Sequence, residues 1–218
     1  MASLSELVEI IARVEGMEPA TVGLIARNVR ETGLISEKGR GRSAAKMTLT
    51  DAANLLIAVN ATVTVRESAQ TLQIYRQLET VTTGFVGNDQ RMVGERVQLG
   101  RALEYLIEAA SNGIFERFFS TTVPSLISTD FRKEQVDIEL VFYKPQPYAQ
   151  LIIYARSGYV VGSRRIDVEA FKRATRIAFD FELPHQIKRG RRKYNGDRKD
   201  ATTIGFPTIR AVAKLLQG

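Results

Sequence analysis

Cysteine and tryptophan are absent from this 218-residue chain, and histidine occurs once, at His185. The lack of cysteine excludes disulfides, thiolate metal sites and a cysteine nucleophile. A single histidine rules out a two-histidine metal site and leaves little material for a Ser–His–Asp triad. No apolar run reaches the roughly 18 residues of a membrane span, so we expect no membrane partner and a cytoplasmic, nucleoid-associated location.

Positive charge is in excess, and most of it lies in one short segment. The net charge of +7 favours a polyanionic partner. Residues 1–66 hold eight Lys/Arg against seven Asp/Glu, a balance of only +1. Segment 185–199 holds nearly all of the excess and predicts a second nucleic-acid contact, with RNA, an acidic partner or a solvated loop as alternatives. Its cations are Lys188, Arg189, Arg191, Arg192, Lys193, Arg198 and Lys199.

The first 33 residues predict two short helices joined by a tight turn. Ser3 and Glu6 match a capping box, and Gly16 suits a left-handed C-cap. The second helix opens at Pro19 and ends at Gly33. Helical spacing gives this second helix an inward face and an outward face. The inward face is Val22, Ile25, Ala26 and Val29, and the outward positions are Ala20, Thr21, Gly23, Leu24, Arg27 and Asn28.

The continuation of these helices predicts a cationic hairpin and a third helix. Leu34-Ile35 pairs as a strand with residues 46–49, and a loop rich in Gly and Arg lies between them. The third helix starts with Thr50 or Asp51 as N-cap and continues through Val59. No helix precedes the first pair, so residues 51–61 or another subunit must cover its apolar face. The segments in this order are 17–22, 29–35 (ending in Gly-Leu-Ile), 39–42 (Gly-Arg-Gly-Arg) and 49–51 (Leu-Thr-Asp).

These segments, in their order and spacing, resemble winged helix-turn-helix regulators of bacteria and phages. The resemblance covers roughly the first 65 residues and implies binding to double-stranded DNA. In the major groove, arginine hydrogen-bonds guanine and asparagine hydrogen-bonds adenine. The arginines of a wing are expected in the minor groove, and its lysines are expected to contact phosphates. A solvated surface role is the alternative for each cation. The implied recognition-helix contacts are Thr21, Leu24, Arg27, Asn28 and Arg30, and the wing contacts are Lys38, Arg40, Arg42 and Lys46.

The remainder predicts an α+β domain with a small antiparallel sheet. Helices are expected at 67–78, 91–110, 168–173 and 207–216, and alternating strands at 136–142, 149–154 and 176–183. The apolar positions of the 91–110 helix serve core packing or dimerisation. We therefore divide the chain into a winged-helix domain (1–65), a helical linker or oligomerisation region (66–115) and a C-terminal α+β domain (116–218) with its basic loop 185–199.

These patterns favour a sequence-specific regulator of transcription, acting as a homodimer without a cofactor or catalytic residues. A second protein partner is expected at the C-terminal domain. Two alternatives remain: a DNA-recognition subunit of a packaging (small terminase) or partition assembly, and a metal-dependent DNA-processing enzyme. The enzyme alternative rests on Asp130, Asp137 and Glu139, but Val141 stands where such nucleases place a lysine. A ring of many subunits would favour packaging, a dimer would favour regulation, and Mg²⁺-dependent cleavage would favour the enzyme.

Overall fold

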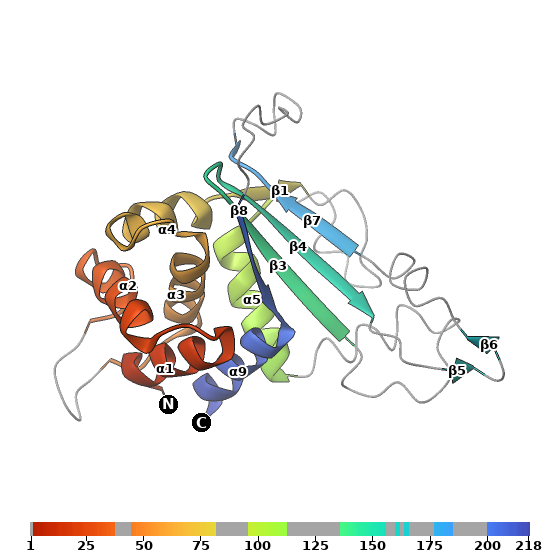
Figure 1. Ribbon diagram of the computed structural model, residues 1–218, viewed down its shortest axis with the longest axis horizontal. Helices are drawn as coiled ribbons and strands as arrows, with labels where there is room; N and C mark the ends of the chain where they lie inside the picture. The colour runs from red at the N-terminus through yellow and green to blue at the C-terminus, as the bar shows by residue number, and fades with distance from the viewer. Residues whose placement is uncertain are drawn as a thin grey trace.

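The computed structural model describes residues 2–37, 45–81, 96–112, 136–155, 160–161, 164–165, 177–184 and 200–218. Within these residues the chain forms six α-helices and small antiparallel sheets, the α+β class expected from the sequence. The helices gather at one end of the molecule, and the largest sheet lies at the other (Figure 1). The helical elements are α1 (Leu4–Glu15), α2 (Pro19–Glu31), α3 (Leu49–Ala61), the short 3₁₀ helix η2 (Val65–Glu67), α4 (Ser68–Arg76), α5 (Leu99–Asn112) and α9 (Phe206–Gln217).

Local sequence signals account for the first two helices. Ser3 and Glu6 form the expected capping box, and Gly16 ends α1 with a φ of 66° in the left-handed region. Pro19 opens α2 at a position where its missing N–H costs no hydrogen bond. The four predicted inward residues of α2 are the four that are buried, namely Val22, Ile25, Ala26 and Val29. The predicted helices, the caps of α1 and the buried face of α2 are confirmed.

Helix α3 is the central element, and all of its residues from Asp51 to Ala61 are buried. Its sequence is mostly apolar, which is typical of a helix enclosed by its neighbours. It packs against α2, α4 and α5, while α9 packs against α1, so residues 51–61 cover the α2 side of the helix pair and α9 covers the α1 side. The helix begins earlier than predicted, because Thr48 is the N-cap and shares a capping box with Asp51.

The main sheet has four antiparallel strands in the order β7-β4-β3-β8. Strands β3 and β4 are joined by the predicted turn at residues 145–147, and strand β7 is the third predicted strand. Strand β8 and a small β1–β2 pair were not predicted, and β2 occupies residues expected to be helical. The strand bounds are β1 (Glu79–Val81), β2 (Arg96–Gln98), β3 (Val136–Lys144), β4 (Tyr148–Ala155), β5 (Val160–Val161), β6 (Arg164–Arg165), β7 (Ile177–Phe181) and β8 (Asp200–Gly205).

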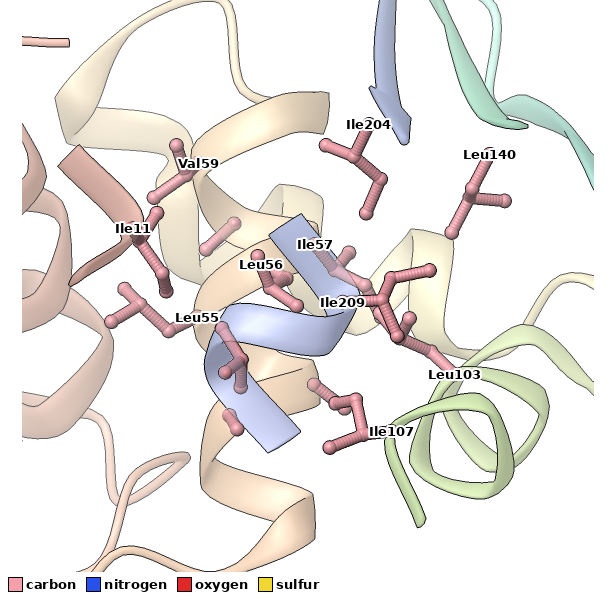
Figure 2. Packing of buried hydrophobic residues seen from close by; sticks show 14 of the residues in the cluster. Ile11, Leu55, Leu56, Ile57, Val59, Leu103, Ile107, Leu140, Ile204 and Ile209 are labelled. Carbon is pink, nitrogen blue, oxygen red and sulfur yellow. The ribbon is translucent and has the colours of Figure 1, made fainter. Parts of the chain in front are cut away.

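One hydrophobic core joins the helices to the sheet. Figure 2 shows side chains from α1, α3, α5, α9, β3 and β8 directed into the same region, among them Ile11, Leu56, Leu103, Leu140 and Ile209. The apolar face of α5 belongs to this core, so it packs within the chain and is not free to make a dimer. The three-part division of the chain stays a prediction, since a shared core does not decide which segments fold independently.

Candidate nucleic-acid interface

The outward face of α2 is the surface on which the DNA-binding hypothesis depends. Of the expected outward positions, Ala20, Thr21, Leu24 and Arg27 are exposed, and Arg30 is exposed beside them. Leu24 is 55% exposed. Gly23 is only partly exposed, because it faces Val8 of α1. The helix therefore offers solvent a mixed face of small, apolar and cationic side chains.

Arg27 is paired on the surface, but weakly. Its Nε donates to Glu31 Oε1 at 2.8 Å, one helical turn later, and the two side chains are 70% and 57% exposed. Exposed i,i+4 pairs of this kind contribute little to stability, because water screens the two charges. The guanidinium can therefore leave Glu31 for a stronger acceptor at little cost. A guanine edge, which accepts two hydrogen bonds from arginine, is such an acceptor.

The prediction that the Asn28 side chain faces outward is wrong, whereas its contact with adenine stays a prediction. Its amide Nδ2 donates to Val65 O at 2.9 Å and to Ser68 Oγ at 2.7 Å, with Arg66 O at 3.4 Å. The two amide hydrogens are thus used inside the protein. No pattern local to α2 could have shown this, because the partners lie about 40 positions further along the chain.

The expected wing is only partly described. Lys38, Arg40 and Arg42 lie outside the described residues, and Lys46 is exposed. The predicted strand pairing between 34–35 and 46–49 is wrong within the described residues. There the N–H of Met47 bonds to Ala2 O at 2.9 Å, and Leu49 opens α3.

Instead, the buried carboxylate of Asp51 holds both ends of the segment between Ser36 and Thr48. Asp51 Oδ1 accepts the N–H of Ser36 at 2.8 Å, and Asp51 Oδ2 accepts the N–H and hydroxyl of Thr48 at 2.9 and 2.8 Å. Asn54, one turn further along α3, donates to Leu34 O at 2.6 Å. The chain leaving α2 and the chain entering α3 are therefore fixed at the same place. Polar residues in an otherwise apolar helix were the sequence signal for these anchors.

Asn54 also belongs to a buried ionic network between α3, α4 and α5. Arg76 donates to Asn54 Oδ1 and, at 2.6 Å, to Glu104 Oε1, while Arg101 donates to Glu104 Oε2 at 2.8 Å. Burial opposes ionisation of Glu104, but the hydrogen bonds from the two arginines outweigh it and hold its pKa below the ordinary value. Gly100 makes room for the network, because a Cβ there would lie 2.5 Å from Arg76 Cγ. This network is structural in character.

The structure describes the residues on both sides of the second predicted contact region, but not the region itself. Residues 185–199, with all seven cations of Lys188–Lys199, lie outside the described residues. Asp200, which follows them, lies opposite Lys144 in the register of strands β8 and β3. Lys144 Nζ in turn lies 3.5 Å from Thr62 O, at the end of α3. The chain therefore re-enters the fold next to the connection that follows α3.

Two of the three residues behind the enzyme alternative are described by the structure. Asp130 lies outside the described residues, while Asp137 and Glu139 lie on one face of β3. Among the residues that the structure describes, no group of three or more His, Asp or Glu could hold a metal ion.

None of the described helices has the length and apolar character needed to span a membrane. A scan against protein-family models and searches of curated proteins and of solved structures found no match to this chain.

Proposed function

We propose that this protein binds double-stranded DNA in a sequence-specific manner, with α2 in the major groove, and that it acts as a regulator of transcription. The observation that carries the proposal is the α1–α2 pair. Two short helices are joined by residues 16–18, with α2 packed on α3 and α1 packed on α9, and the outward face of α2 is exposed. This supersecondary unit is the one that places a helix in the major groove.

The proposed contacts divide by chemistry. Arg27 reads a guanine edge, Leu24 meets a thymine methyl, and Thr21 and Arg30 contact phosphates. Thr21 lies in the first turn of α2, where free backbone N–H groups favour an anion. Lys46 lies just before Thr48, one of the two points anchored on Asp51, and is proposed to contact phosphate. No described feature favours packaging, partition or DNA cleavage over this proposal.

Leu24→Glu tests whether α2 is the recognition helix. Because Leu24 is 55% exposed, the change leaves the core intact. It places a negative charge among the phosphates, and we expect the Kd for DNA selected from a random library to rise by about tenfold or more. Fluorescence anisotropy measures the Kd, and footprinting of the genomic DNA that flanks the gene locates the site.

The matched control is Tyr105→Glu, since Tyr105 is a 47% exposed aromatic residue on α5. It should leave the Kd unchanged. Equal affinity of both variants and the wild type would remove α2 from the interface. Failure of the wild type to bind any duplex would overturn the proposed function itself.

Arg40 and Arg42 carry a separate prediction, which concerns salt. Replacing both by Ala should weaken binding and reduce the slope of log K against log salt by about two, since each neutralised phosphate contributes about 0.9. Titrations between about 50 and 200 mM salt measure this slope. The charge-conserving pair Arg40→Lys and Arg42→Lys should retain most of it. An unchanged affinity for the alanine variant would contradict the wing assignment.

A further inference from the structure

The connection between α3 and α4 is fastened to the proposed recognition helix. It consists of residues 62–67, and its 3₁₀ helix η2 packs against α2. Asn28 of α2 holds one end of it through Val65 O and Ser68 Oγ, at 2.9 and 2.7 Å. The other end is close to Lys144, whose Nζ is 3.5 Å from Thr62 O. Both ends are therefore attached to elements of the folded core.

Arg66 is the exposed cation that this connection presents. Its carbonyl lies 3.4 Å from the amide of Asn28, so the side chain leaves the backbone directly beside α2. Arg27 is paired with Glu31 and Arg76 with Glu104, but Arg66 has no ion pair with another described residue. Its neighbour Glu67 points in another direction, because successive side chains of a 3₁₀ helix diverge by about 120°.

We infer that Arg66 contacts a DNA phosphate beside the groove that α2 occupies, and that Asn28 is a positioning residue for Arg66. This inference rests on the proposed function. A phosphate is the expected acceptor because the backbone strands flank the groove on both sides of a recognition helix. A cation carried on a preformed connection loses less conformational entropy on binding than one on a free chain. Arg66 was not among the contacts predicted from the sequence, since nothing local to it indicates that it lies beside α2.

The test measures the Kd of the full chain for its selected duplex and for a scrambled duplex over a series of salt concentrations. Arg66→Ala is expected to weaken binding to both duplexes by a similar factor, about three- to tenfold, and to reduce the salt slope by about one. Arg66→Lys should restore most of the slope. Lys214→Ala is the matched control, because it removes one exposed charge from α9, which packs on α1 and α5.

Asn28 is tested by a double-mutant cycle with Arg66. If Asn28 acts through Arg66, Asn28→Ala reduces the salt slope in the wild type and has little further effect in Arg66→Ala. A base-reading Asn28 would instead change the preference between duplexes and keep its effect when Arg66 is absent, which would overturn the positioning role. Thermal unfolding of each variant accompanies these measurements. Arg66 is exposed, so its alanine variant is expected to fold normally.

Two results separate the inference from the function on which it rests. If the wild type binds its duplex and Arg66→Ala matches Lys214→Ala in Kd and slope, Arg66 is no phosphate contact and the proposed function stands. If the wild type binds no duplex, both fall together.

Discussion

Replacing Glu104 by alanine is expected to lower the free energy of unfolding by about 3 kcal/mol, the lower end of the range for a buried ion pair that loses one partner. The variant leaves Arg76 mostly buried without its carboxylate, which accepts from Arg76 at 2.6 Å. The lower end applies because 26% of the Arg76 side chain is exposed and water can reach it. Urea unfolding followed by circular dichroism measures the change.

Glu108→Ala is the matched control, since Glu108 is an exposed acid one turn later on α5. A second variant isolates the charge. Replacing Arg76 by Met together with Glu104 by Leu should cost less than Glu104→Ala alone, because it leaves no unpaired ion in the core. If Glu104→Ala were no more destabilising than Glu108→Ala, the network would contribute nothing to stability. Glu104→Gln keeps the shape of the side chain and provides a measurable variant should the alanine form fail to fold.

Glu15→Gln is expected to stabilise the protein by about 3 kcal/mol above about pH 8 and to have no effect below about pH 4. Burial raises the pKa of Glu15 from 4.5 to about 7, although Asn60 donates to its carboxylate at 3.2 and 3.0 Å. Glu15 is also the last residue of α1, where the helix carbonyls disfavour negative charge. Glutamine keeps an oxygen for Asn60 and carries no charge.

The direction follows from the difference between the folded and unfolded states. Well below pH 4.5 the carboxyl is protonated in both states, so ionisation costs no stability. Between 4.5 and about 7 the unfolded chain ionises first, and wild-type stability falls as the pH rises. Glu9→Gln, on the exposed side of α1, should not reproduce this pattern. A stability difference between Glu15→Gln and wild type that is independent of pH would contradict the assignment.

Signals within about four residues of one another predicted α1 and α2 together with their caps and buried faces. A capping box, a helix-ending glycine and an N1 proline act on the backbone beside them, so their effect needs no other part of the chain. Strands β3 and β4 were predictable for the same reason, because the alternation of side chains is local. Strands β1 and β2 have only three residues each, and the six residues of β8 lack an alternation of apolar and polar side chains. Their partners lie elsewhere in the chain.

The sequence by itself thus determined the α1–α2 helix pair, the strand hairpin and the α+β class, because each follows from neighbouring residues. Only the tertiary structure decided what the outward face of α2 contains. Asn28 is removed from that face by partners about 40 positions away, and the same contacts bring Arg66 to its side. Likewise Asp51 and Asn54 anchor a segment that precedes them by up to 20 positions. A buried polar group must find a partner wherever the packed chain provides one, and no local pattern encodes that choice.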